Sequence, residues 1–288
     1  CHALIQGDLV IDVPADSQVH KQIVRKAADL RDIVLDTTVQ LHYVEVEEPT
    51  LDSQTGDLER LIQALDMQWS LDQLEEIDIR SLQRIQLCLR KGDWKVTVAV
   101  HRNARIIAIW SGFQGNAYGV AFDIGTTTIA AHLCDLASGE VLASHGIMNP
   151  QIRFGEDLMS RVSYVMMNPG SEIELTRTVR AGINEVIKNI RTEAQVEASK
   201  ILNLTFVGNP IMHHLLLGID PTELGGAPFA LASNSGMTLW ATELDILETS
   251  LDARAYILPC IAGHVGADTA SVILSESPHL SDEITLIV

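Results

Sequence analysis

Basic residues are scarce in this sequence. The 288-residue chain has 20 Lys and Arg against 38 Asp and Glu, which gives a formal net charge of -18 at pH 7. Such a charge repels phosphate backbones and anionic membrane surfaces at long range, so we expect neither a nucleic-acid partner nor a membrane partner. Any phosphate-bearing ligand would have to be held locally, by backbone N–H groups and a metal ion.

Long apolar runs and paired cysteines are also absent from the sequence. No run approaches the ~18 to 20 apolar residues that span a bilayer, and no charged-then-apolar leader opens the chain, which predicts a cytoplasmic protein. The cysteines form no C-x-x-C pair, so neither a zinc site nor a disulfide framework is indicated. Cys88 and Cys134 lie in apolar patterns, and we expect both to be buried. The other two cysteines are Cys1 and Cys260.

The length and the ends of the chain suggest a piece of a longer protein. A length of 288 residues predicts roughly two domains, and a hydrophobic content of 47% is ample for their cores. The chain starts on Cys1 in place of Met, and it ends on "DEITLIV", which is half of a strand pattern with no turn after it.

Residues 18–112 have the pattern of a small α+β unit. Helical spacing marks residues 19–30, 57–65 and 79–89, and an alternating strand pattern ends near Pro49. The runs "WKVTVAV" and "RIIAIW" predict a hairpin joined at residues 101–103. No group of residues in this block demands a particular chemistry.

Residues 113–288 have a different pattern, with the predicted order β-β-β-α-β-α-β-α-β. Three alternating runs come first, and a long helix follows with apolar residues at positions 175, 179, 183, 186 and 190. The helix "GADTASVIL" and a last strand, "EITLIV", end the chain. This order predicts an α/β fold whose mixed sheet carries helices on its faces.

The stretch "YGVAFDIGTTT" places a carboxylate, a glycine and three threonines after a strand-like run. A tight turn at Gly125 lets successive N–H groups point into one concavity, where a polyphosphate can accept them without lysine. Thr126, Thr127 and Thr128 add hydroxyl donors, and Asp123 could hold Mg²⁺ through its waters. The same residues also suit an ordinary hydroxyl-rich turn, so the hexapeptide alone leaves both interpretations open.

Several polar residues further along also allow two interpretations. Asn209 either faces a ligand or caps the helix that follows it. Adjacent helical residues point about 100° apart, so His213 and His214 suit satisfied structural roles better than a shared metal. His264 and Asp268 lie at the entrance of the "GADTASVIL" helix. Asp268 either approaches a metal and phosphate or is a first-turn acid favoured by the helix dipole.

Four ordered motifs together resemble the reductive activators of corrinoid proteins. They are "YGVAFDIGTTT", "NPQIRFGEDLMSRV", "VGNPIMHHLLLGIDP" and "PCIAGHVGADTASVIL". The segments "DLERLIQAL" and "GDWKVTVAV" resemble the linker and middle regions of that family, so the resemblance covers nearly the whole chain. It implies the end of a ferredoxin domain over residues 1–17 and linker and middle regions over 18–112. Residues 113–288 would be the first ribonuclease H-like, actin-like subdomain of an ATPase of the acetate and sugar kinase, heat-shock chaperone and actin superfamily.

The resemblance also implies roles for individual residues. Asp123 would be catalytic by positioning Mg²⁺, Gly125 to Thr128 would hold phosphates of ATP, and Asp268 would be a second catalytic residue near the metal and the γ-phosphate. The same nucleotide site would include Asn209, Gly263 and Gly266. Cys1 would be the last of four cysteine ligands to a 2Fe-2S cluster, which a single thiolate cannot hold. The second phosphate loop of the family should follow "EITLIV", but the chain stops there.

These implications predict an ATP-dependent activator that returns an inactive Co(II) corrinoid to Co(I). Electrons would arrive through an iron-sulfur domain outside this chain, and the partner would be a corrinoid protein or a corrinoid-dependent methyltransferase system. A homodimer is a further expectation. Two alternatives stay open. One is a small-molecule kinase on the same fold, for which no carboxylate is clearly placed as a general base. The other is a non-catalytic module that dimerises or docks a corrinoid protein.

Overall fold

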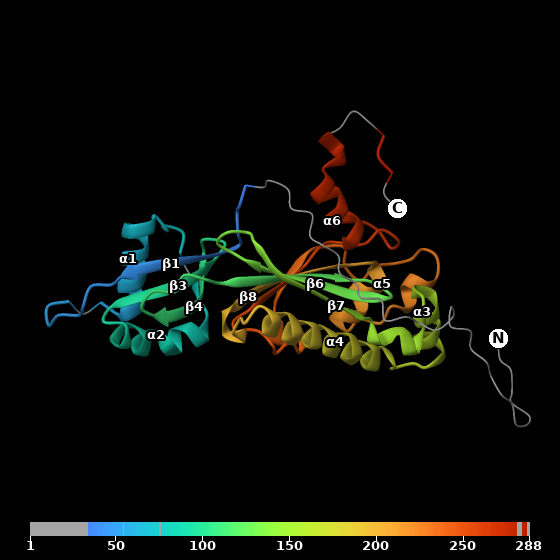
Figure 1. Ribbon diagram of the computed structural model, residues 1–288, viewed down its shortest axis with the longest axis horizontal. Coiled ribbons are helices and arrows are strands. Elements are labelled where there is room, and N and C mark those ends of the chain that lie inside the picture. The colour runs from blue at the N-terminus through green and yellow to red at the C-terminus, as the bar shows by residue number, and fades with distance from the viewer. Residues whose placement is uncertain (1–33, 54, 75, 281–283, 287–288) are drawn as a thin grey trace, which may run out of the picture.

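The computed structural model describes residues 34–53, 55–74, 76–280 and 284–286. The molecule is elongated, with a smaller sheet at one end and a larger sheet that continues along its length (Figure 1). Cys1 and the helix expected over residues 19–30 lie outside the described residues. The predicted α/β class is confirmed by these mixed sheets and their helices.

The first sheet contains four strands in the order β1-β3-β4-β2. Its elements are β1 (Val39–Glu45), α1 (Asp57–Trp69), β2 (Glu76–Ile77), α2 (Ile79–Lys91), β3 (Lys95–His101) and β4 (Arg105–Ser111). Apolar side chains of the strands and of both helices share one core, which includes Val44, Val98, Leu61, Leu65, Ile85 and Leu89. The helices predicted over residues 57–65 and 79–89 and the predicted hairpin are therefore confirmed, whereas β2 is only two residues long and shows no period in the sequence.

The second sheet contains six strands in the order β7-β6-β5-β8-β10-β9. Strands β5, β8 and β10 run parallel, and β6, β7 and β9 are antiparallel to their neighbours. Helix α4 lies along one face of this mixed sheet (Figure 1). The elements are β5 (Tyr118–Ile124), β6 (Thr128–Asp135), β7 (Val141–Met148), α3 (Leu158–Met167), α4 (Glu172–Glu193), β8 (Ile201–Gly208), α5 (Pro210–Leu217), β9 (Met237–Trp240), β10 (Arg254–Ile257) and α6 (Ala267–Glu276).

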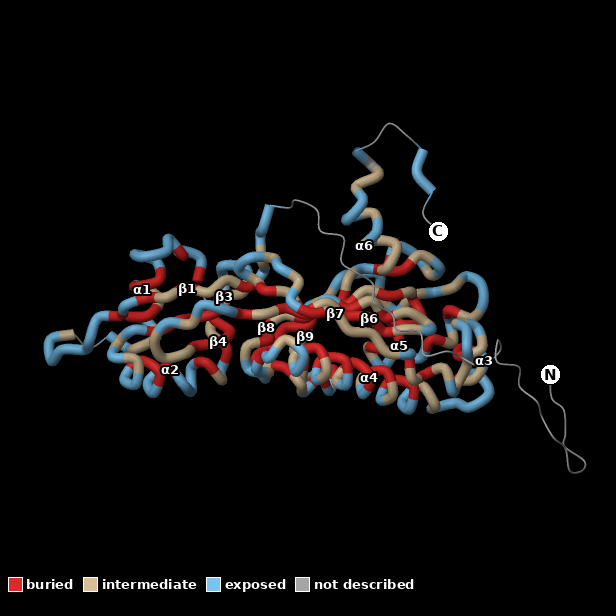
Figure 2. Tube along the Cα trace, in the orientation of Figure 1, coloured by how far each residue is buried: buried red, intermediate tan, exposed pale blue. Residues whose placement is uncertain are grey.

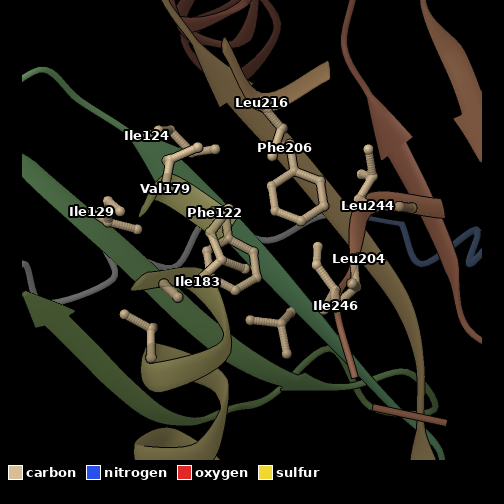
Figure 3. Close-up of a cluster of buried hydrophobic side chains, with 14 of the residues drawn as sticks. Phe122, Ile124, Ile129, Val179, Ile183, Leu204, Phe206, Leu216, Leu244 and Ile246 are labelled. Carbon is tan, nitrogen blue, oxygen red and sulfur yellow. The ribbon is translucent and has the colours of Figure 1, made fainter. Parts of the chain in front are cut away.

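A continuous apolar core lies between this sheet and α4. Phe122 and Phe206 come from neighbouring parallel strands, and their stacked rings have centroids 4.9 Å apart. Val179 and Ile183 of α4 belong to the same cluster (Figure 3). The apolar stripe predicted for the long helix is buried at every position, and buried residues also run along the strands (Figure 2). Because each fully buried side chain of this size contributes about 1.5–3 kcal/mol, this core stabilises the packing of α4 on the sheet.

The first sheet packs against the start of the second. A small buried cluster spans the junction and contains Val39, Ala99, Ile107, Ala117 and Leu202. Beside it, Arg254 of β10 donates to both carboxylate oxygens of Asp78 at 2.7 Å. The Arg254 guanidinium also lies 3.3 Å from the ring centroid of Trp240. Since Asp78 and Arg254 are both buried, a desolvated ion pair fixes one sheet to the other.

Several details differ from the sequence expectations. Strand β9 was not predicted because four strand residues between loops show no clear period. Of the expected strand "EITLIV" the structure describes only residues 284–286, which are exposed and not in a strand. Cys134 is half-buried because it shares the less covered face of β6 with Thr128 and His132. No helix in the described ranges is long and apolar enough to cross a bilayer.

Candidate functional site

Most of the predicted site residues follow the carboxyl ends of three parallel strands. Ile124 of β5 pairs with Gly208 of β8, and Ile257 of β10 pairs with Phe206 of β8. The loop after β5, Asn209 after β8 and the segment after β10 therefore emerge at the same edge of the sheet. Open α/β sheets bind their ligands at this edge.

The loop after β5 is a tight hairpin. The N–H of Gly125 donates to the carbonyl of Thr128 at 2.9 Å, so Thr126 and Thr127 form the tip. Thr127 is exposed and Thr126 is half-buried. A Cβ atom on Gly125 would lie 2.9 Å from the Thr128 carbonyl oxygen, and the φ of Gly125 is not positive. Glycine is therefore required by the close approach of the two strands and not by a left-handed conformation.

Three successive carbonyls of this loop accept hydrogen bonds from Asn149 and Arg161. Asn149 Nδ2 donates to the Gly125 carbonyl at 2.8 Å, and Arg161 Nη2 donates to the Thr126 carbonyl at 2.5 Å. The backbone N–H of Asn149 donates to the Thr127 carbonyl at 2.7 Å. In a planar trans peptide the N–H points opposite to the C=O. The N–H groups of Thr126 and Thr127 therefore point away from Asn149 and Arg161.

The side chains behind the loop form a buried polar cluster that consists of Asn149, Gln151 and Arg161, each 0% exposed. Gln151 Oε1 accepts from Arg161 Nη1 at 3.1 Å, and Gln151 Nε2 donates to the Leu175 carbonyl at 2.9 Å. Arg161 Nε donates to the Gly155 carbonyl at 3.0 Å. Burial lowers the pKa of Arg161 to about 10, so the guanidinium is still charged at neutral pH.

Asp123 is the penultimate residue of β5 and lies half-buried at the same edge of the sheet. Its carboxylate suits Mg²⁺, because this ion keeps several waters and takes one or two protein carboxylates together with phosphate oxygens. The described residues contain no group of three or more His, Cys, Asp or Glu that could hold a metal. A magnesium ion shared between Asp123, water and phosphate therefore fits these residues, whereas an all-protein metal cage does not. Cys1, the expected cluster ligand, lies outside the described residues.

Asn209 and Gly266 meet at this edge of the sheet. Asn209 Oδ1 accepts the N–H of Met212 at 3.0 Å, which confirms that Asn209 caps α5. Gly266 precedes α6, and a Cβ atom on it would lie 2.7 Å from both Asn209 Cα and the Gly208 carbonyl oxygen. The start of α6 is therefore pressed against the end of β8. A contact of either residue with nucleotide stays a prediction.

The segment between β10 and α6 contains the remaining predicted residues. Asp268 lies in the first turn of α6, and its Oδ1 accepts the N–H of Thr269 at 2.7 Å. A Cβ atom on Gly263 would lie 2.1 Å from the Phe229 carbonyl oxygen, so Gly263 is a close-packing position. His264 is exposed, and its ring centroid lies 4.0 Å from that of Phe229. The proposed role of Asp268 toward a metal stays a prediction.

The two adjacent histidines of α5 have different surroundings. His214 is satisfied as predicted, because its Nδ1 lies 2.9 Å from the Pro210 carbonyl and its Nε2 accepts the N–H of Ala232 at 3.1 Å. His213 is 4% exposed, and neither ring nitrogen has a hydrogen-bond partner among the described residues. The expectation of a satisfied side chain is therefore wrong for His213. Burial, together with the neighbouring His214, lowers the pKa of His213 to about 4, so its ring is neutral at pH 7.

The sequence did not identify Asn149, Gln151 and Arg161 as site residues, although all three lie in the motif "NPQIRFGEDLMSRV". One signal was available, because Asn directly before Pro is typical of a helix cap. Asn149 does cap the short 3₁₀ turn Pro150–Phe154 by accepting the N–H of Gln151. The side-chain contacts of Asn149 and Arg161 with the loop join positions 24 and 35 residues apart, and no local pattern reports them.

Comparisons with known proteins match both sheets of the chain. Residues 28–116 match the family described as the RACo linker region, and residues 118–281 match the RACo middle region. The corrinoid activation enzyme RamQ of Eubacterium limosum is 34% identical over 157 residues, which are 54% of this chain and 26% of RamQ. A solved structure of a reductive activator for a corrinoid, iron-sulfur protein superimposes with a TM-score of 0.81 at 32% identity.

These relatives are longer than this chain. The superposition covers 95% of this chain and 46% of the solved activator, so the chain spans about half the length of that protein. The two matched regions meet at residue 117, in the connection between β4 and β5. The middle-region match alone covers more than half of the chain. The chain therefore belongs to the RACo family, the reductive activators of corrinoid proteins, and carries the linker and middle regions of that family.

Proposed function

We propose that the full-length protein uses ATP to return an inactive Co(II) corrinoid, bound to a partner protein, to Co(I). Electrons would be delivered by a 2Fe-2S domain that is not among the described residues. Family membership supports the corrinoid partner. The reduction needs coupling to ATP if the electron donor is too weak, since each ~59 mV of one-electron mismatch is a tenfold penalty in equilibrium.

One observation carries the ATP part of this proposal, namely the anchoring of the loop after β5. A hairpin that served only as a turn would not need three carbonyls held by Asn149 and Arg161, both of which are fully buried. The anchoring turns the N–H groups of Thr126 and Thr127 away from Asn149 and Arg161, in the loop that directly follows the strand carrying the half-buried Asp123. Donors that are fixed before the ligand arrives are suited to phosphate oxygens.

Each residue at this edge has a role in the proposal. Asp123 orients Mg²⁺ through water, and Gly125 to Thr128 hold phosphates through N–H and hydroxyl donors. Asn209, Gly263 and Gly266 border the nucleotide, and Asp268 faces the metal and the terminal phosphate. Nucleotide binding then acts by coupling, because a ligand that contacts one arrangement of these elements better than another shifts the protein toward it.

Strand β10 connects this site to the first sheet. It is four residues long and begins at Arg254, which pairs with Asp78, the residue between β2 of the first sheet and helix α2. Its other end leads to the segment before α6, where Gly266 packs on Asn209. A change at the nucleotide edge would therefore reach the first sheet through a single strand, which supports coupling between ATP and the redox partner.

The direct test is Co(I) formation by the full-length protein in the presence of reductant and the corrinoid partner, followed by absorbance, with and without Mg-ATP. We expect ATP to raise the rate or the final yield, and no effect of ATP would contradict the proposal. Phosphorylation of a small acceptor without any corrinoid would favour the kinase alternative instead. Tight Mg-ATP binding by the 288-residue chain would count against a purely non-catalytic docking module. A homodimer and a cytoplasmic location stay predictions from the sequence.

A further inference from the structure

A charged guanidinium lies fully buried behind the loop after β5. Arg161 is 0% exposed, and none of the ion pairs found among the described residues includes it. Its nitrogens donate to neutral acceptors, which are the carbonyls of Gly155 and Thr126, Gln151 Oε1 and Met212 Sδ. The positive charge therefore has hydrogen-bond partners but no buried counter-ion.

The carboxylate of Asp157 favours the charged form of Arg161, but only weakly. Its influence raises the pKa of Arg161, but burial outweighs it and the net shift is downward. Asp157 is exposed and caps α3 by accepting the N–H of Ser160 at 2.7 Å. Water around an exposed carboxylate screens its attraction for a buried cation. Since an uncompensated buried charge is costly for folding, the guanidinium should have a use that a neutral side chain would not serve.

Hydrogen bonding to the loop does not by itself require a charge. Asn149 holds the Gly125 carbonyl with a neutral amide. Arg161 instead bonds to the Thr126 carbonyl, and the same peptide unit carries the N–H of Thr127 on its opposite edge. A cation at the carbonyl polarises the peptide and makes that N–H a stronger donor. It also adds a positive potential on the open side of the loop.

We propose that Arg161 is a positioning residue that makes the loop select ligands by phosphate charge, with a nucleoside triphosphate preferred over a diphosphate and a diphosphate over a monophosphate. This inference rests on the proposed function, because it places a nucleotide at the loop. The path from Arg161 Nη2 through the peptide to a phosphate oxygen on Thr127 N–H is ~8 Å long. At an effective dielectric constant of ~20 the attraction corresponds to ~30-fold in affinity per unit of ligand charge.

The sharpest test cancels the charge of Arg161 without removing its side chain. Gln151→Glu has nearly the same shape, keeps an oxygen 3.1 Å from Arg161 Nη1, and adds a buried counter-charge. Calorimetric titrations of the full-length protein with ATP, ADP and AMP, at saturating Mg²⁺, give the ratios of the affinities. We expect the ATP-to-ADP affinity ratio to fall at least ~10-fold in Gln151→Glu.

Variants of Arg161 itself separate charge from shape. Arg161→Gln should lower the ATP-to-ADP ratio as Gln151→Glu does, whereas Arg161→Lys should keep most of it because the charge remains. Arg180→Gln is the matched control. Arg180 is mostly buried and also bonds a carbonyl, that of Leu216, but it pairs with Asp245 away from the loop. Its replacement should leave the ratio unchanged.

The outcomes separate the two proposals. If wild type binds ATP but the ratio is unchanged in Gln151→Glu, Arg161 acts only in folding and the inference is overturned, while the proposed function stands. A uniform loss of affinity for all three nucleotides has the same meaning. If wild type binds none of the three nucleotides, the proposed function fails and the inference fails with it. Thermal unfolding of Gln151→Glu confirms that the comparison is made on folded protein.

Discussion

Replacing Gly266 with Ala tests whether the start of α6 is packed against β8 as tightly as the structure shows. The added Cβ would lie 2.7 Å from Asn209 Cα and from the Gly208 carbonyl oxygen, and both are backbone atoms that have little room to move. Overpacking of this kind costs about 1–3 kcal/mol. The Ala side chain also restricts the unfolded chain, which returns about 0.4–1 kcal/mol. We therefore expect Gly266→Ala to change the free energy of unfolding by between about 0 and -2.6 kcal/mol.

The same substitution at Gly226 is the matched control. Gly226 has an extended backbone with φ -150°, like Gly266 with φ -87° and ψ -172°, but nothing lies within 4 Å of its added Cβ. Gly226→Ala should therefore leave the free energy of unfolding unchanged or raise it by about 0.4–1 kcal/mol. Urea unfolding of the two variants and wild type measures the difference. Equal midpoints for Gly266→Ala and Gly226→Ala would refute the tight contact between α6 and β8.

Three further substitutions test the sheet junction, the buried histidine and the loop anchor. Arg254→Met leaves Asp78 buried without its main partner, so we expect a loss of about 3–5 kcal/mol at pH 8 in urea unfolding. Burial already raises the pKa of Asp78 to about 6, so at pH 5 this carboxyl is mostly protonated and needs Arg254 less. The loss of unfolding free energy in Arg254→Met should therefore be smaller at pH 5 than at pH 8. A loss that does not change with pH would contradict the buried ion pair. His213→Leu removes a group whose pKa is lowered from 6.5 to about 4. Wild type should lose up to ~3 kcal/mol of unfolding free energy as the pH falls from about 6.5 to about 4, and His213→Leu should lose less. Identical pH profiles of stability for the two proteins would count against a neutral buried ring. Asn149→Ala removes the side-chain bond to the Gly125 carbonyl and should cost about 1–3 kcal/mol and weaken Mg-ATP binding, whereas unchanged binding would argue against anchoring.

The sequence predicted those parts of the fold that have a strong local period. The stripe of α4 runs from Leu175 to Ile190 of a 22-residue helix, and β5 and β6 alternate over seven and eight residues, so their existence and order followed from pattern alone. Elements with few residues, such as β2 and β9, have too short a pattern to stand out. The structure places the loop after β5 at the carboxyl edge of the parallel strands, and its role as a phosphate site stays a prediction.

The contacts that hold the loop could not be predicted from local pattern. Arg161 lies on α3 among apolar residues, where a long charged side chain usually reaches solvent, yet it is fully buried against the Thr126 carbonyl. His213 and His214 are adjacent and chemically identical, but only His214 reaches a hydrogen-bond acceptor and donor. Such differences depend on which surfaces meet in three dimensions, and the sequence carries no period that reports them.

The most direct test of the account compares ATP-stimulated Co(I) formation by the full-length wild type with that of Asp123→Asn. Asp72→Asn is the matched control, because Asp72 is exposed and lies in the first sheet unit, away from the loop. Loss of one metal-orienting carboxylate should weaken the ATP response by ~10- to 100-fold at a fixed ATP concentration, while Asp72→Asn should respond as wild type does. An ATP response in Asp123→Asn equal to that of wild type would contradict the assignment of the Asp123 loop as the phosphate site.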